Sequence, residues 1–249
     1  MSLFRQIVVA FCAIVMLPAV AVQAAVIGAN FSGGISAMGP GDAGVVPSTN
    51  WNNIADNNAG IVTTPGLIDN TGLATSLSLS ITQSNVAGGT NPMFADPDNN
   101  AMYTGHSWIQ GSPITVTATS VPYSQYDLYV YFRSGQIPFD HPQLFSIDNS
   151  LNNTVLFSQE GLEQASPGGA SQSNFLQSTG SIAGANLTYG NYVKFSNVNL
   201  PAFRLNLSVL NTYTYLNGLQ IVQVPEPTSL TLMGLAAVGM LVAAGRRRA

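Results

Sequence analysis

Apolar and polar side chains alternate along several short segments of this chain, and the strongest example is the heptapeptide YDLYVYF at residues 126–132. Successive side chains of an extended strand point to opposite faces. One face would therefore carry Leu128, Val130 and Phe132. The other face would carry Asp127, Tyr129 and Tyr131. Because both faces carry large side chains, the pattern predicts a central strand that is covered on both sides.

Further segments with a two-residue period predict additional strands, separated by stretches rich in Gly, Pro, Asn and Ser. They lie at residues 25–31, 77–81, 114–119, 144–148, 154–158, 192–195, 203–209 and 216–222. No segment shows a convincing amphipathic helical period. Eight or nine short strands predict an all-β fold, a single β-sandwich that is jelly-roll-like.

Two of these segments also resemble strands of known modules. Residues 126–132 and residues 216–222 (LNGLQIV) are similar to strands of galactose-binding-like and malectin-like modules. Those modules are jelly-roll sandwiches that are often attached to exported glycan-active proteins. The resemblance implies a jelly roll for this chain and contact with carbohydrate.

The first 24 residues have the pattern of a secretory signal peptide. Arg5 supplies the positive charge, residues 7–22 form the apolar stretch, and Val22-Gln23-Ala24 offers small residues for cleavage. We expect signal peptidase to remove residues 1–24; an uncleaved membrane anchor is the alternative. Cys12 is the single cysteine of the chain and lies in the apolar stretch, so the mature protein would contain neither a thiol nor a disulfide.

The last 26 residues, 224–249, combine three features in a fixed order. They are the triplet Pro225, Glu226 and Pro227, the uncharged run 228–245, and the basic cluster Arg246, Arg247 and Arg248. The run approaches the ~20 residues that a helix needs to cross a bilayer. The prolines prevent the helix from extending backwards, and the arginines are expected on the cytoplasmic side. The segment predicts a C-terminal transmembrane helix; a buried core helix is the alternative.

The same order of triplet, apolar helix and Arg cluster resembles the PEP-CTERM tail of exported bacterial proteins. In that family an exosortase, a membrane transpeptidase-like enzyme, recognises and processes the tail. The resemblance covers 26 of the 249 residues and implies no activity for the others. It implies that the protein is exported, is first anchored in the inner membrane by its C-terminal helix, and then reaches the cell surface or the extracellular matrix.

Residues 25–223 are expected to form one ectodomain between the signal peptide and the tail. Only 7% of the residues in the chain are charged. The segment 25–226 contains all eleven acidic side chains and three basic ones, which gives it a formal charge of −8. Nucleic acid is not expected as a partner, because phosphate binding requires clustered cations.

Three aromatic residues in polar segments, Trp51, Tyr103 and Trp108, are candidates for sugar binding. Aromatic rings stack on sugar rings, while neighbouring Asn and Asp side chains bind hydroxyl groups. The alternative is that these rings close the end of the sandwich core.

One short acidic segment could bind a structural calcium ion. Asp96, Asp98 and Asn100 place oxygen donors close together, as Ca²⁺ requires. The segment lacks the Gly and the distal Glu of an EF-hand loop, and an Asx turn is the alternative. No other cofactor is expected.

The sequence contains no recognisable motif for nucleophilic, metal-dependent or dinucleotide-dependent catalysis. His106 and His141 are expected to be solvated histidines in separate loops. Asp96, Asp98 and Asp127 leave a two-carboxylate hydrolase open, but no spacing selects a pair. We therefore expect a non-catalytic surface or extracellular-matrix protein. A carbohydrate-binding module that recognises extracellular polysaccharide is the first alternative, and a glycan-active hydrolase is the second.

Overall fold

The computed structural model describes residues 24–31, 35–54, 61–82, 85–88, 94–133, 141–149, 153–163, 174–210 and 213–225. Residues 25–224 form one compact unit. The predicted signal peptide, except for Ala24, lies outside the described residues, as do the run 228–245 and the Arg cluster. Among the helices that are described, none is both long enough and apolar enough to cross a membrane.

The described strands form three sheets. The five-stranded sheet has the order β11 (Tyr192–Val198), β8 (Tyr126–Tyr131), β14 (Gly218–Gln223), β1 (Val26–Asn30) and β2 (Asn52–Asn53). The six-stranded sheet has the order β10 (Val155–Glu163), β9 (His141–Asn149), β12 (Phe203–Val209), β7 (Ile114–Thr119), β4 (Ser78–Ile81) and β3 (Val62–Thr64). The three-stranded sheet has the order β13 (Tyr213–Leu216), β6 (Gly105–Gln110) and β5 (Asn85–Gly88).

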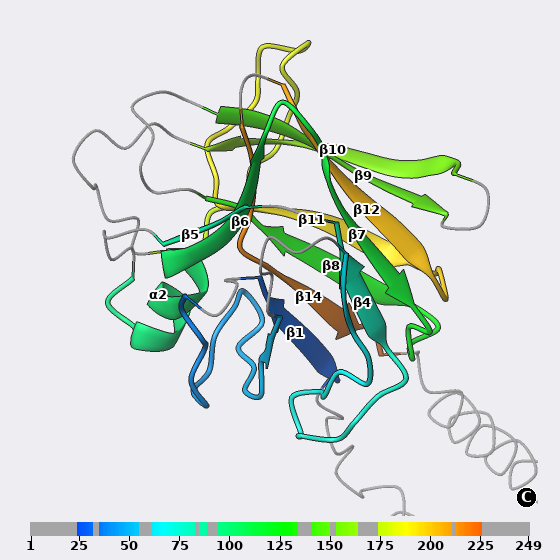
Figure 1. Cartoon of the computed structure of the whole chain (residues 1–249). Coiled ribbons are helices and arrows are strands. Elements are labelled where there is room, and N and C mark those ends of the chain that lie inside the picture. The colour runs from blue at the N-terminus through cyan, green and yellow to red at the C-terminus, as the bar shows by residue number, and fades with distance from the viewer. Residues whose placement is uncertain are drawn as a thin grey trace, which may run out of the picture. The chain divides into compact units, whose positions relative to one another are not determined.

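The two larger sheets lie one over the other and enclose a single apolar core (Figure 1). The core side chains alternate along the strands as the two-residue period predicts. Strands β8 and β12 illustrate this alternation with Leu128, Val130, Phe203, Leu205 and Leu207. The first strand, β1, pairs antiparallel with the last, β14, and the chain passes repeatedly between the sheets. The predicted all-β, jelly-roll-like sandwich is therefore confirmed.

Strand β8 is covered on both faces, as its sequence predicts. It lies between β11 and β14, and Tyr129 and Tyr131 on its outer face are buried along with its core-facing residues. Tyr131 is held by the loop that precedes β2, because the backbone N–H of Val45 donates to its hydroxyl oxygen at 2.8 Å. The amide of Gln220 on β14 donates to the carbonyl oxygen of Val46 at 2.8 Å. This loop therefore forms an outer layer over the five-stranded sheet.

The alternation predicts no strand between residues 85 and 108, but this segment contains β5, the helix α2 (Pro97–Thr104) and most of β6. The side chain of Asp96 caps α2 by accepting the backbone N–H of Asn99 at 2.8 Å. Proline begins the helix, where its missing N–H is not needed. The helix has only eight residues and no distinct apolar stripe, so a search for helical periodicity does not detect it.

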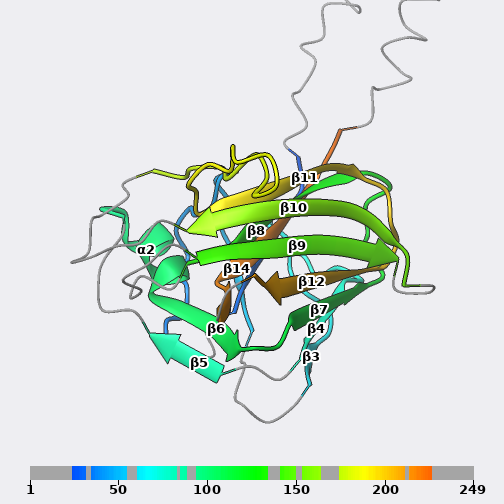
Figure 2. The ribbon, with the colours of Figure 1, turned by 90° about the horizontal axis from the view of Figure 1, so that it is seen from above.

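The three-stranded sheet and the two ends of the domain lie at opposite ends of β1. Near the start of β1, the N–H of Gln223 donates to the carbonyl oxygen of Ala25 at 2.9 Å. Beyond its other end, the hydroxyl of Ser107 on β6 donates to the carbonyl oxygen of Phe31 at 2.9 Å. Figure 2 shows β5, β6 and α2 together at one end of the two large sheets. The three-stranded sheet is thus remote from the point where both terminal segments leave the domain.

Candidate functional site

Trp51 lies in the outer layer over the five-stranded sheet and is only 5% exposed. Its indole packs flat against β1 at Gly28, where an added Cβ atom would lie 2.7 Å from the ring. The indole N–H donates to the carbonyl oxygen of Ser48 at 2.9 Å. The ring is therefore covered, but it lies outside the core between the two large sheets and does not close the end of that core.

Tyr103 lies on α2 and is 3% exposed. Its hydroxyl donates to the carbonyl oxygen of Asn191 at 2.9 Å. Its ring stacks on Phe94 with the ring centres 5.4 Å apart, and it meets Tyr131 edge-on at 6.1 Å. Tyr103 therefore anchors α2 to the five-stranded sheet, and its ring is enclosed by other aromatic rings.

Trp108 differs from the other two candidates because it is half-buried and lies on the outer face of the three-stranded sheet. In register, it stands between Asn85 of β5 and Tyr215 of β13. Its ring meets Tyr213 edge-on, with the ring centres 5.6 Å apart. Of the three predicted aromatic residues, only Trp108 therefore has a ring with appreciable exposure to solvent.

Strand register identifies the other residues on this outer face. Residues directly opposite in antiparallel strands share a face, as do residues two apart in one strand. We use "aromatic face" for the set His106, Trp108, Gln110, Tyr213, Tyr215 and Asn85. The opposite face of the same sheet points inward, because Leu216 is part of the core and Ile109 packs against it.

The aromatic face has a buried base and a more exposed rim. Tyr215 and His106 form the base, with ring centres 5.4 Å apart. Tyr213 is half-buried, and its ring centre lies 6.0 Å from that of Tyr215. Asn85 and Gln110 are exposed and occupy the positions opposite Trp108 and Tyr213. Aromatic rings bordered by amide groups can stack on a sugar ring and hydrogen-bond its hydroxyls.

The sequence analysis named only Trp108 among these residues. The alternation in Tyr213-Thr214-Tyr215 is a strand signal that could have identified β13. Its pairing with β6 could not have been predicted, because about a hundred residues separate the two strands in the chain.

His106 is not the solvated loop residue that the sequence predicts. It lies within β6, is 3% exposed, and its Nδ1 has no hydrogen-bond partner among the described residues. Burial lowers the pKa of His106 from 6.5 to about 4, because the charged imidazolium would lose its hydration. The imidazole is therefore neutral at ordinary pH. The side chain of His141 lies outside the part of the structure that can be described.

This depressed pKa predicts that acid destabilises the domain. Between about pH 6.5 and pH 4 the unfolded chain binds a proton at His106 that the folded chain does not, so the free energy of unfolding falls as the pH falls. A pKa shift of this size lowers the free energy of unfolding by about 3 kcal/mol once the pH is below both pKa values. Urea denaturation of the full chain in detergent at pH 7, 5.5 and 4 would measure it. A His106→Phe variant should show a shallower decline, whereas an identical decline would contradict the assignment.

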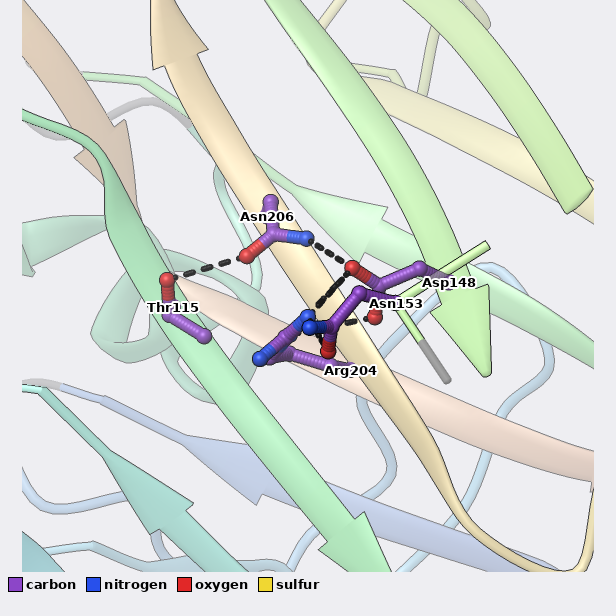
Figure 3. A network of polar contacts seen from close by, with 5 residues as sticks. All are labelled: Thr115, Asp148, Asn153, Arg204 and Asn206. Carbon is purple, nitrogen blue, oxygen red and sulfur yellow. Dashed lines mark hydrogen bonds and ion pairs between the residues drawn. The ribbon is translucent and has the colours of Figure 1, made fainter. Parts of the chain in front are cut away.

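A second polar cluster lies on the outer face of the six-stranded sheet (Figure 3). The guanidinium of Arg204 on β12 donates to both carboxylate oxygens of Asp148 on β9, through Nε at 3.1 Å and Nη2 at 2.8 Å. The amide of Asn206 donates to Asp148 at 3.0 Å and accepts the hydroxyl of Thr115 on β7 at 3.0 Å. Arg204 also donates to the side chain of Asn153. The network joins three adjacent strands, so we assign it to the stability of the sheet.

The residues of the predicted calcium site form structural contacts around α2. Asp96 is the N-cap, and the backbone N–H of Asn100 donates to its carbonyl oxygen at 3.0 Å. The carboxylate of Asp98 lies against Gly41, where an added Cβ atom would be 1.9 Å from Oδ2. Within the described residues, no group of three or more His, Cys, Asp or Glu side chains is placed to hold a metal ion. Calcium binding by Asp96, Asp98 and Asn100 stays a prediction.

The acids considered for hydrolysis have structural partners as well. The carboxylate of Asp127 forms an ion pair with Lys194 at 2.7 Å and accepts the backbone N–H of Asn197 at 2.9 Å. Asp96 and Asp98 lie at the start of α2, on a different element from Asp127. A hydrolase that uses two of these carboxylates stays an untested alternative.

Comparison with known proteins identifies the C-terminal tail. Residues 223–248 match the PEP-CTERM protein-sorting motif, which confirms the resemblance drawn from the sequence. The chain is thus a secreted surface protein that exosortase sorts and processes. The motif begins at Gln223, the last residue of β14, so the sorting signal follows the folded domain directly.

Comparison with curated sequences and solved structures adds little. No curated protein gives a significant sequence match. A carbohydrate-binding module, CBM36 in complex with calcium and xylotriose, matches with 10% identity and a TM-score of 0.28, over 57% of this chain and 91% of that one. A superposition this poor supports no inference about fold or ligand.

Proposed function

Because exosortase sorts this chain to the surface, we propose that the sandwich is a non-catalytic module that binds extracellular polysaccharide. Signal peptidase removes residues 1–24, and the run 228–245 holds the precursor in the inner membrane. Exosortase then processes the tail, and the domain remains at the cell surface or in the extracellular matrix.

The observation that carries this proposal is the exposure of Trp108 and Tyr213 beside the amides of Asn85 and Gln110. On β4, β7 and β12 of the six-stranded sheet, by contrast, the outward positions carry Ser, Thr, Arg and Asn instead of aromatic rings. Stacking requires a flat ring, and hydroxyl recognition requires donors and acceptors at its edge. The aromatic face combines both.

The position of the aromatic face suits binding at a surface. It lies at the end of β1 opposite Ala25 and Val224, where the terminal segments join the domain. A non-catalytic role is supported by the structural partners of Asp96, Asp127 and Asp148.

Replacement of Trp108 by alanine tests the proposed function. We expect affinity for the polysaccharides that the parent binds to fall by at least about tenfold, or about 1.4 kcal/mol, since a central aromatic residue often dominates an interface. The measurement is binding of the full chain, in a mild non-ionic detergent, to an array of neutral and charged polysaccharides.

The matched control is Tyr189→Ala, which removes an aromatic side chain that is 44% exposed and lies outside the aromatic face. This control should bind like the parent, and both variants should keep the circular dichroism spectrum of the parent. Binding by Trp108→Ala that equals parental binding would contradict the proposed site. Failure of the parent to bind any polysaccharide would contradict the proposed function.

A further inference from the structure

The charges of the domain restrict the kind of polysaccharide that the aromatic face can bind. Residues 25–226 contain only three basic side chains, Arg133, Lys194 and Arg204, against eleven acidic ones. A site for uronate or sulfate groups needs a cation that can reach the ligand. The environment of each basic side chain therefore decides whether anionic chains can be bound.

Two of the three cations are engaged by carboxylates. Arg204 pairs with Asp148 on the outer face of the six-stranded sheet, at 2.8 Å, as Figure 3 shows. Lys194 pairs with Asp127 at 2.7 Å and lies over the ring of Tyr129, 5.1 Å from its centre. These carboxylates neutralise both charges, which weakens the attraction of either cation for an anionic ligand.

The third cation, Arg133, is 4% exposed. It follows β8, and its backbone N–H donates to the side chain of Asn217. A guanidinium this deeply buried cannot reach a polymer that lies on the surface.

The aromatic face itself contains no cation. Strands β5, β6 and β13 read NVAG, GHSWIQ and YTYL, without Lys, Arg, Asp or Glu. His106 is buried in its base and stays uncharged at neutral pH, since burial lowers its pKa to about 4. The face therefore offers rings and amides, in a domain whose net charge repels anions.

On the basis of the proposed function, we infer that the aromatic face selects neutral polysaccharides and rejects uronate-bearing or sulfated chains. Binding arises from stacking and from hydrogen bonds of Asn85 and Gln110 to hydroxyl groups. Such contacts are short-range and exchange few counterions, so affinity should depend little on salt.

Matched polymer pairs test this inference. Hydroxyethylcellulose and carboxymethylcellulose share one backbone and differ in charge, as do dextran and dextran sulfate. Affinity electrophoresis of the full chain in non-ionic detergent should show retardation by a neutral member and about tenfold weaker retardation, or none, by its charged partner. Raising NaCl from about 50 to about 500 mM should change the affinity for the neutral polymer less than about twofold.

A charge-gain variant provides the complementary test. Gln110 is exposed on the rim opposite Tyr213, so Gln110→Lys places a cation beside the rings. This variant should gain binding to the charged polymer of each pair at about 50 mM NaCl and should lose that gain at about 500 mM. The control, Ser158→Lys, adds the same charge at an exposed position of the edge strand β10 of the six-stranded sheet and should gain none.

The outcomes separate this inference from the proposed function. Tighter, salt-sensitive binding of the parent to the charged members would overturn the neutral-ligand inference and leave polysaccharide binding intact. An equal gain in Gln110→Lys and Ser158→Lys would overturn the location at the aromatic face. No retardation by any of the four polymers would count against the proposed function and the inference together.

Discussion

Replacing Val130 by aspartate should unfold the sandwich domain. Val130 is fully buried in the core on the central strand β8, where it pairs with Val193 on β11 and Leu219 on β14. An aspartate there would place a carboxylate among apolar side chains, without a cation or donor to compensate it. An uncompensated buried charge costs several kcal/mol, and loss of the valine adds about 1.5–3 kcal/mol. The sum is comparable to the typical stability of a whole domain, about 5–15 kcal/mol.

Thermal unfolding of the full chain in detergent, followed by circular dichroism, measures this effect. The matched control is Val155→Asp on β10, where the side chain is 58% exposed and the expected change lies within about 0.5 kcal/mol. A Val130→Asp variant that melts at the parental temperature would show that the face of β8 has been assigned wrongly.

Replacing Pro225, Glu226 and Pro227 by three alanines should abolish maturation of the protein almost completely. Val224 still belongs to the fold, because its N–H donates to the carbonyl oxygen of Gln125 at 3.0 Å. The triplet therefore lies at the junction between the domain and the apolar run, within the matched sorting motif. Prolines disfavour a helical backbone, so we expect the triplet to be extended, a form that an enzyme can bind along the main chain. The alanine variant should accumulate as a full-length precursor in the membrane fraction.

Immunoblotting of membrane, surface and culture fractions from an exosortase-positive host gives the readout. Two controls allow this readout to be interpreted. The parent in an exosortase-negative host should resemble the alanine variant. Truncation before Pro225 should release the domain without an anchor. Normal maturation of the alanine variant would mean that the triplet only marks a helix boundary. Replacement of Arg246, Arg247 and Arg248 then tests whether the basic cluster is needed as well.

Most of the sandwich strands could be predicted from the sequence. Strands β7, β8 and β12 have nearly the bounds that their alternation indicates, because a sheet with one core-facing side requires apolar residues at every second position. Strands β2, β3, β5, β6 and β13 and the helix α2 were missed. They are short, and they carry polar or aromatic residues on a partly exposed face, so no simple period marks them.

The candidate site was only partly predictable. Trp51, Tyr103 and Trp108 looked equivalent because each lies in a polar stretch of the chain. The fold separates them: Trp51 is covered where it packs on Gly28, and Tyr103 is enclosed by Phe94 and Tyr131. Of the three, only Trp108 remains partly exposed to solvent. It lies on a sheet that is completed by strand β13, which comes from a distant part of the chain.

The sequence by itself determined the features that are local or additive. These are the strand pattern, the net negative charge, and the sorting tail, which is a contiguous signal. The tertiary structure alone decided which aromatic rings face solvent and which basic side chains are engaged by carboxylates. Arg204 pairs with Asp148, 56 positions away, and Trp108 meets Tyr213 through the pairing of β6 with β13. Burial and ion pairing depend on contacts between distant segments, and the period of a single strand contains no information about its partner.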